Sequence, residues 1–287
     1  MGVKALWAIL LLVGSLFGVQ FHYSSTKVAN GKTFMITAKP GKNEPIERIY
    51  AAFEGKRYPF YRNPIHPKRG YYVLIPIDYH ATPHRARVTV VTVKNGEKRY
   101  KSRWIRIIKG RYPKESLTVS AAKARLSAED RKRVDREYKE AMAIYLKETK
   151  RPRFRSRFRL PLKSRITSPY GTARLFNHLL KSYHSGTDFK AKTGTPIKAA
   201  NSGRAVLVKN RFFAGNSVVI DHGEGIYTGY YHLSGFCVKA GDFVKKGDII
   251  GYAGSTGRVT GPHLHLSTTL HGMQVDPLQL FSLLNRL

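Results

Sequence analysis

The residues best suited to chemistry lie near the end of the chain, in the segment GPHLHL at 261–266. His263 and His265 are separated by one residue, and alternate side chains of an extended strand point to the same face. The two imidazoles could therefore be two ligands of one metal ion, a ligand beside a catalytic base, or two polar residues on a solvated strand. The pair by itself does not decide between these interpretations.

Two other segments of the C-terminal part supply candidate residues. HSGTDF at 184–189 contains His184 and Asp188, and YYHLS at 230–234 contains His232. Zinc binds neutral imidazole and carboxylate, and catalytic zinc sites keep three protein ligands and an open position. His184, Asp188 and one histidine of the first pair would complete such a set. The other histidine and His232 would then be free to accept a proton from water and to stabilise the oxyanion or protonate the leaving amine during amide hydrolysis.

The remaining histidines and the single cysteine are expected to be structural or exposed. Cys237 is the only cysteine, which excludes an intrachain disulfide and a cysteine-based zinc site, so any metal must be held by histidine and carboxylate. We expect Cys237 to be a small buried side chain. His222 is expected to make a structural hydrogen bond at a strand end, and three histidines in Pro-rich loops are expected at the surface: His66, His80 and His84.

The elements that must position the C-terminal residues are predicted to be strands. The segments 203–210, 216–223 and 226–234 and the run 242–257 are apolar stretches separated by glycine-rich turns. This pattern is typical of an antiparallel β domain with little helix. We place this domain at residues 161–287.

Before this domain, the pattern predicts a small β-sandwich-like module at 22–112 and a connector at 113–160. Turn residues separate the short strands, and Asn95–Gly96 predicts a hairpin. The strands are expected at 33–38, 48–55, 71–77, 86–93 and 103–109. The fold class is therefore mainly β, with one connecting helix.

The connector is predicted to hold a helix and a basic strand. The helix is expected at 128–148, with Ser127 as its N-cap. Its apolar stripe, which should pack between the domains, consists of Val134, Tyr138, Ala141, Met142 and Tyr145. In KRPRFRSRFRL (150–160) arginine alternates with phenylalanine, which predicts a strand with a basic face. That face is either simply solvated or in contact with wall or membrane.

The N-terminus and the charge indicate export and an anionic partner. Lys4 precedes an apolar run from Ala5 to Val19, which is typical of a signal peptide, placed at residues 1–21, or of an uncleaved N-terminal membrane anchor. The net charge is +33. Because an exported protein does not meet nucleic acid, we expect the partner to be peptidoglycan carboxylates or anionic lipid headgroups. The expected location is the periplasm or cell envelope.

Five segments together resemble the lysostaphin/LytM-type zinc metallopeptidases. They are HSGTDF, NSVVIDHG, YYHLS, VKKGDIIGYAGSTGRVTGPHLHL and VDPLQL, and the resemblance covers about 161–281. It implies that His184, Asp188 and His265 bind one zinc ion. It also implies that His263 and His232 are the catalytic pair, with His263 favoured as general base and His232 as oxyanion or leaving-group partner, although these roles could be exchanged.

The resemblance also implies a substrate. Members of the family cut peptide bonds in peptidoglycan cross-bridges, and a chain with an N-terminal β module looks more like the Gram-negative relatives. This favours D,D-endopeptidase activity, with D,D-carboxypeptidase activity as an addition. The alternatives are a non-catalytic regulator or wall-binding module that activates another hydrolase, and a polybasic lipid-binding protein whose zinc is only structural.

Overall fold

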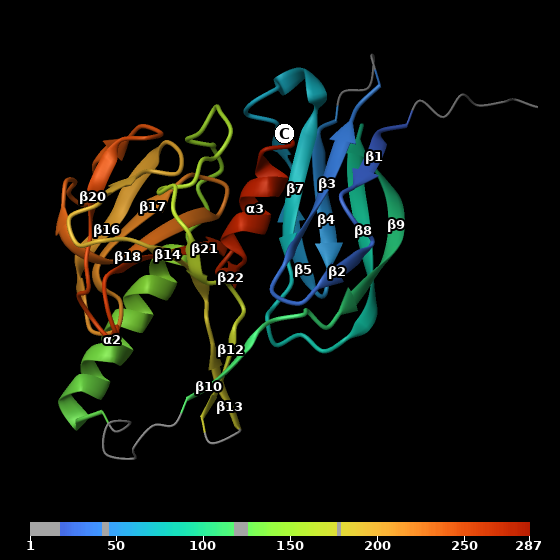
Figure 1. The fold of residues 1–287 in the computed structure, drawn as a ribbon. Helices are drawn as coiled ribbons and strands as arrows, with labels where there is room; N and C mark the ends of the chain where they lie inside the picture. Colours follow the sequence, from blue (N-terminus) through green and yellow to red (C-terminus); the bar gives the residue numbers. More distant parts are fainter. Residues whose placement is uncertain (1–17, 42–45, 118–125, 177–178) are drawn as a thin grey trace, which may run out of the picture.

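The chain folds into two β regions with a short helix between them (Figure 1). The computed structural model describes residues 18–41, 46–117, 126–176 and 179–287. Strands dominate these residues, and helices α2 (Ala128–Tyr145) and α3 (Pro277–Leu284) are the longer helical segments. The mainly β fold expected from the sequence is confirmed. In the described residues no helix is both long enough and apolar enough to cross a membrane.

The N-terminal module consists of two sheets that face each other across one hydrophobic core. One sheet has the strand order β1-β3-β7-β6, and the other has the order β2-β9-β8-β4-β5. Strand β1 begins at Gln20, directly after the apolar run of the sequence. The strands of the first sheet are β1 (Gln20–Tyr23), β3 (Thr33–Lys39), β6 (Tyr61–Arg62) and β7 (Tyr71–Pro76). The strands of the second sheet are β2 (Lys27–Ala29), β4 (Arg48–Phe53), β5 (Lys56–Pro59), β8 (His84–Lys94) and β9 (Glu97–Ile108).

The four-stranded sheet is buried on both faces, which explains its continuous apolar sequence. In β7, Val73 and Ile75 point into the core of the module, whereas Tyr72 and Leu74 join the core of the C-terminal region. A strand that lies between two cores needs no polar face, so YYVLIPI does not alternate. The module thus lies in layers against the C-terminal region, and the five-stranded sheet is the outer layer.

The predicted hairpin at Asn95–Gly96 is confirmed. It joins β8 to β9, with Lys94 opposite Glu97, and both turn residues have positive φ values of 50° and 76°. Two residues with positive φ give the turn that matches the twist of paired strands.

The C-terminal region is built on an antiparallel sheet with the central strand order β11-β14-β21-β18-β17-β16-β19. Strand β15 pairs with β20, which also pairs with β18, and β22 pairs with β21. The strands are β11 (Ile166–Ser168), β14 (Gly186–Lys190), β15 (Pro196–Lys198), β16 (Gly203–Arg211), β17 (Gly215–Asp221), β18 (Ile226–Phe236), β19 (Phe243–Val244), β20 (Ile249–Ala253), β21 (His263–Leu270) and β22 (Met273–Val275).

A separate three-stranded sheet links the two regions. Strand β10 (Lys114–Leu117) pairs in parallel with β12 (Ala173–Phe176), which forms an antiparallel hairpin with β13 (Leu179–Tyr183). Part of the expected connector therefore extends a hairpin of the C-terminal region.

Helix α2 begins at the predicted cap, where the Ser127 side chain accepts a hydrogen bond from the backbone N–H of Asp130. Ala141 and Tyr145 are buried against the C-terminal sheet. The prediction for Tyr138 is wrong, because this ring is 64% exposed. Before its last turns the helix contacts β16 through polar groups at Arg133 and Glu137, and the Tyr138 ring lies outside this contact.

Two further predictions are wrong. Residues 150–160 form no strand. Phe154 and Phe158 are buried as the alternation suggested, but the backbone bonds to side chains: Asn285 Nδ2 donates to the carbonyl of Phe158 and Asn201 Nδ2 to that of Ser156. Cys237 is exposed rather than buried, because it follows the end of β18, beyond the body of the sheet.

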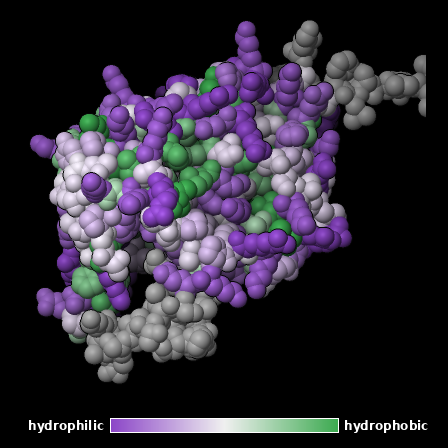
Figure 2. Space-filling view, viewed as in Figure 1, coloured by the Kyte–Doolittle hydropathy of each residue, from purple (hydrophilic) through white to green (hydrophobic). Residues whose placement is uncertain are grey.

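The visible face of the molecule is covered mainly by hydrophilic side chains, with hydrophobic ones in smaller groups between them (Figure 2). Helix α3 lies between the two β regions (Figure 1). Its N-cap Asp276 forms an ion pair with Lys32 of the N-terminal module. The Gln279 side chain accepts a hydrogen bond from the backbone N–H of Thr33 and donates one to the Thr33 carbonyl.

Candidate metal centre

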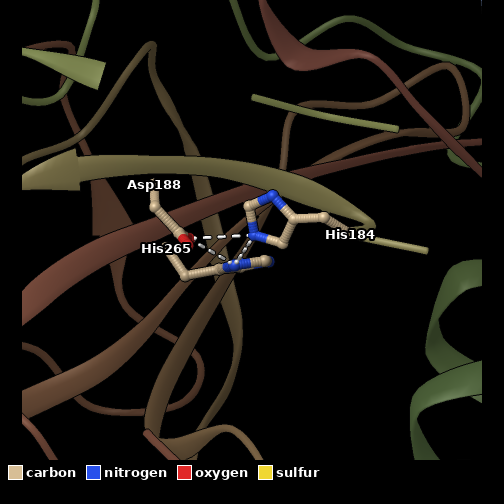
Figure 3. A group of neighbouring side chains, drawn as sticks. All are labelled: His184, Asp188 and His265. Carbon is tan, nitrogen blue, oxygen red and sulfur yellow. Dashed lines mark hydrogen bonds and ion pairs between the residues drawn. The ribbon is translucent and has the colours of Figure 1, made fainter. Parts of the chain in front are cut away.

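Strand pairing brings Asp188 and His265 together. Antiparallel β14 and β21 place these two residues directly opposite each other, so their side chains share a face. His184 lies just before β14, four residues ahead of Asp188, and its ring turns back toward the same point (Figure 3). All three side chains are largely buried.

Their polar atoms form a compact triangle (Figure 3). His184 Nε2 lies 3.0 Å from Asp188 Oδ1 and 3.0 Å from His265 Nδ1, and the last two atoms are 2.8 Å apart. Ligands at 2.0–2.2 Å from a tetrahedral zinc ion would be about 3.3 Å from one another. The three side chains can therefore hold a metal ion with little movement.

Neighbouring backbone groups fix the ring of His184. Its Nδ1 lies 3.0 Å from the carbonyl oxygen of Pro169 and 3.2 Å from Ser168 Oγ. Because the Pro169 carbonyl can only accept, Nδ1 carries a proton, and Nε2 is the ring nitrogen that faces Asp188 and His265. Support of this kind from outside the ligand set fixes tautomer and orientation in metal sites.

The ring of His265 is held between a glycine and an aromatic side chain. A Cβ atom on Gly186 would overlap both His265 Nε2 and the carbonyl oxygen of Leu266, so the strand must have a glycine here. On the other side the Tyr231 ring stacks on the imidazole, with centroids 5.4 Å apart and planes 14° apart. Position 231 carried no chemical signal in the sequence beyond its place beside His232.

His263 lies beside the triangle on the same strand face as His265. Its Nδ1 is 2.8 Å from the carbonyl oxygen of Gly261 and donates to it, so Nε2 keeps its lone pair. This Nε2 is 3.7 Å from Asp188 Oδ1. His263 therefore turns Nε2, rather than Nδ1, toward Asp188 and the neighbouring ligand triangle.

His232 reaches the site through a β-bulge. Between Asn216 and Val218 of β17, strand β18 carries one extra residue, and His232 has a positive φ of 61°. Bulges redirect side chains next to active sites. Without this one, Tyr231 and His232 would point to opposite faces, whereas the rings of His232 and His263 are in fact 4.9 Å apart.

His232 is also oriented by the backbone. Its Nδ1 lies 2.9 Å from the carbonyl oxygen of Thr256 and donates to it, which leaves Nε2 free. Burial, together with the neighbouring His265, lowers the pKa of His232 to about 4. The ring is therefore neutral at physiological pH.

The electrostatics of the triangle suit a cation. Burial alone would raise the pKa of Asp188, but hydrogen bonds from His184 and His265 outweigh it and hold the pKa below the usual range. Burial lowers the pKa of His265, although Asp188 opposes this effect. A buried carboxylate beside two imidazole nitrogens gives the donor set that zinc prefers.

The other histidines among the described residues do not join the ligand triangle. His222 is fully buried, and its two ring nitrogens lie 2.8 Å from the Ser202 carbonyl oxygen and from Thr228 Oγ1, as expected of a structural residue. The surface positions predicted for His66, His80 and His84 are confirmed, although His84 begins β8 and does not lie in a loop.

Comparison with known proteins identifies this part of the chain. The model of Peptidase family M23 matches residues 182–277, a range that contains all five candidate residues. Residues 182–277 match peptidase family M23 and are called the M23 domain from here on. Within the M23 domain the match therefore includes β14, β18 and β21, the strands that carry or directly follow the candidate residues.

Curated relatives of the M23 domain include two named peptidoglycan enzymes. Peptidoglycan DD-endopeptidase ShyA of Vibrio cholerae is 41% identical over 124 residues, which is 43% of this chain and 29% of the relative. DD-carboxypeptidase/endopeptidase Mpg of Neisseria meningitidis is 40% identical over 116 residues, which is 40% of this chain and 26% of the relative. The chain thus spans less than a third of the length of these relatives.

One solved structure is similar over most of the chain. It is a crystal structure from Pseudomonas aeruginosa assigned to peptidase M23, with 26% identity and a TM-score of 0.67. The alignment covers 88% of this chain and 94% of that one, so the likeness extends from the M23 domain into the N-terminal β module.

Proposed function

We propose that this chain is a zinc metallopeptidase that hydrolyses peptide cross-links of peptidoglycan. The observation that carries the proposal is the triangle of His184 Nε2, Asp188 Oδ1 and His265 Nδ1, beside which two further histidines present free Nε2 atoms. The names of the relatives ShyA and Mpg support peptidoglycan as the substrate.

The chain's own residues would divide the work of amide hydrolysis. A zinc ion held by His184, Asp188 and His265 would supply a Lewis acid and lower the pKa of water. His263 Nε2, beside Asp188, would accept the proton of the attacking water as general base. The proton that His263 takes from the water would pass to the leaving amine, directly or through Nε2 of neutral His232, whose ring the Thr256 carbonyl holds beside His263.

The bond that we propose is the D,D cross-link, with D,D-carboxypeptidase activity as an addition. ShyA is named a DD-endopeptidase and Mpg a DD-carboxypeptidase/endopeptidase. We also propose that the chain acts outside the cytoplasm, in the periplasm or cell envelope, because Lys4 and the apolar run Ala5–Val19 are typical of an export signal or anchor.

A non-catalytic regulator is the less favoured function. Such a protein would not need two oriented free imidazoles next to a complete ligand set. The positive φ of His232 also argues against a regulator. A non-glycine residue in the left-handed region costs about 1–3 kcal/mol, and such strain gathers at functional sites.

The metal dependence of cleavage tests the proposal. Full-length protein is stripped with a chelator, and a purified cross-linked muropeptide dimer is added with or without zinc. We expect no cleavage after stripping, recovery with zinc, and no activity in His265→Ala. His66→Ala, which changes an exposed histidine, serves as the matched control and should keep full activity. Cleavage by stripped protein or by His265→Ala would overturn the assignment.

A further inference from the structure

The outward face of the five-stranded sheet carries an unbalanced positive charge. In β2, β4, β8 and β9 every second residue points away from the module core. Strand pairing places these outward residues opposite one another, so they form one face. Six exposed cations lie on this face: Lys27, Arg48, Arg85, Arg87, Lys98 and Arg106. The outward positions of these four strands include no Asp or Glu, and among the described residues none of the six cations forms an ion pair.

This imbalance does not simply follow from the high charge of the whole chain. Helix α2, which is also exposed along most of its length, has five Lys/Arg and five Asp/Glu among its eighteen residues. Surface charges of mixed sign keep a protein soluble without creating a strong field, whereas a face of one sign attracts the opposite charge. The sheet face is therefore a specific feature of the N-terminal module.

Exposed aromatic rings lie among these cations. Trp104 is 55% exposed and Tyr100 is 65% exposed, and both belong to the outward side of β9. The Arg85 guanidinium lies 5.4 Å from the centre of the Trp104 ring. Tryptophan and tyrosine are amphipathic rings that concentrate where a membrane meets water, and basic residues are drawn to anionic headgroups.

The position of the sheet in the molecule leaves this face open. The four-stranded sheet separates it from the C-terminal region, and in Figure 1 strand β9 lies on the side of the module away from α3. The chain also enters the module next to β9: Phe21 and Tyr23 of β1 contact Lys101 and Arg103.

We propose that the outward face of β2, β4, β8 and β9 docks on the anionic headgroups of a phospholipid bilayer. The apolar run Ala5–Val19 ends one residue before β1 begins, so no linker separates it from the module. If this run enters a bilayer, the module must lie at the bilayer surface. Docking would then fix which way the M23 domain faces.

The fluorescence of Trp104 tests this contact in the full chain. The sequence has two tryptophans, Trp7 and Trp104, so Trp7→Phe leaves Trp104 as the only reporter. Vesicles contain phosphatidylcholine alone or mixed with phosphatidylglycerol. We expect Trp104 emission to move to shorter wavelength only with phosphatidylglycerol, and to return at about 1 M salt, where the Debye length falls to about 3 Å. Binding through the apolar run would occur on both lipids and would leave Trp104 in water.

Two variants of equal charge separate the sheet face from net charge. In the Trp7→Phe chain, Arg87→Gln, Lys98→Gln and Arg106→Gln remove three cations from the sheet face. Arg131→Gln, Lys132→Gln and Arg136→Gln remove three exposed cations from α2. Because each basic residue near an anionic surface contributes roughly a factor of five, the sheet variant should need about 100-fold more phosphatidylglycerol for half of the emission shift. The α2 variant should match the parent.

Three outcomes would overturn the proposal. One is the absence of a phosphatidylglycerol-dependent shift, and another is equal loss in both triple variants, which would show an effect of net charge alone. The third is that the parent binds purified sacculi, the sheet variant does not, and vesicles cause no emission shift. That result would assign the face to the wall polymer. Cleavage of a soluble muropeptide dimer should be the same in all these proteins, so failure of docking is distinguishable from failure of the peptidase assignment.

Discussion

At the scale of single residues, the two histidines of HLHL are used through different nitrogens. His265 directs Nδ1 into the ligand triangle, whereas His263 donates from Nδ1 to a backbone carbonyl and keeps Nε2 free. The first is suited to hold a metal, and the second is suited to accept a proton. Their shared strand face explains why both are near Asp188.

This division predicts that catalysis and metal retention can be separated by mutation. His263→Ala should keep bound zinc but lower kcat by about 10²–10⁴-fold, the usual contribution of a general base. Asp188→Ala should lose both zinc and activity. Metal content by mass spectrometry and kcat on a muropeptide dimer measure the two effects. Loss of zinc in His263→Ala would show that His263 is a ligand instead.

A second prediction at this scale concerns Gly186. Gly186→Ala would place a methyl group against His265 Nε2 and the Leu266 carbonyl, so the imidazole must leave its position. We expect zinc affinity to fall by at least about 10-fold, the lower range seen when support of a ligand is lost. Gly235→Ala is the control, because its added Cβ meets no atom within 4 Å. Equal zinc affinity in both variants would contradict the close contact between Gly186 and the His265 ring.

The spacing of His263 and His265 predicts their shared strand face, whereas the choice of His265 as the ligand beside His184 and Asp188 came from the resemblance to LytM-type peptidases. The position of His232 could not be derived this way, since it depends on a bulge opposite Ser217 for which the strand alternation gives no sign. Cys237 was mispredicted because burial depends on where a strand leaves the sheet, and composition does not reveal that.

At the scale of elements, helix α2 supports the site from outside the M23 match. Tyr145, in its last turn, shares a hydrogen bond of 3.0 Å with the hydroxyl of Tyr231, whose ring stacks on His265. Ser267 also donates to the Tyr231 hydroxyl. The connector helix is thus coupled to a candidate ligand through one tyrosine.

Removal of the Tyr145 hydroxyl should reveal this coupling. Tyr145→Phe removes one of the two hydrogen bonds of the buried Tyr231 hydroxyl, which costs about 0.5–1.5 kcal/mol of unfolding free energy, and it should also weaken zinc binding measurably. Tyr138→Phe, on the same helix but exposed, should change neither quantity. Denaturant unfolding and zinc titration are the measurements. If Tyr145→Phe lowers stability but not zinc affinity, Tyr145 only packs the helix.

Elements with regular periodicity were predicted best. The hairpin of β8 and β9 and the cap of α2 follow from local chemistry at Asn95–Gly96 and Ser127. Residues 150–160 alternate as a strand would, but their backbone bonds to Asn201 and Asn285, which are distant in sequence. Local alternation showed which side chains are buried there, but not the conformation.

At the scale of the whole molecule, buried contacts join the N-terminal module to the M23 domain. Tyr79 of the module stacks on Tyr183, the residue before His184, with ring centroids 3.7 Å apart. Tyr72 of β7 donates a hydrogen bond to Glu224, whose other oxygen is buried with no partner among the described residues. The module is therefore packed against residues that adjoin the site.

The Glu224 contact predicts a specific pH dependence of stability. Burial raises the pKa of Glu224 to about 8, with a smaller contribution from Glu148 and opposition from Tyr72 and Arg155. Between its ordinary pKa of 4.5 and about 8 the folded state keeps a proton that the unfolded state loses, so unfolding free energy falls as pH rises through this window. The loss should be on the order of 3 kcal/mol.

Glu224→Gln should remove this dependence. Its unfolding free energy should fall less than that of the parent between pH 5 and pH 8, with the two proteins most alike at pH 5, where Glu224 is neutral in the folded state. Denaturant unfolding at both pH values gives the comparison. A parent protein whose stability changes no more than that of Glu224→Gln would show that Glu224 is ionised in the fold.

The most direct test of the central claim is the identity of the bond that is cut. Purified sacculi are digested with the zinc-loaded full-length protein, and the soluble products are identified by mass spectrometry, with His263→Ala as the inactive comparison. The account predicts that cross-linked dimers are converted to monomers with free D-alanine carboxyl termini. Unchanged cross-links, or products cut only in the glycan strands, would contradict it.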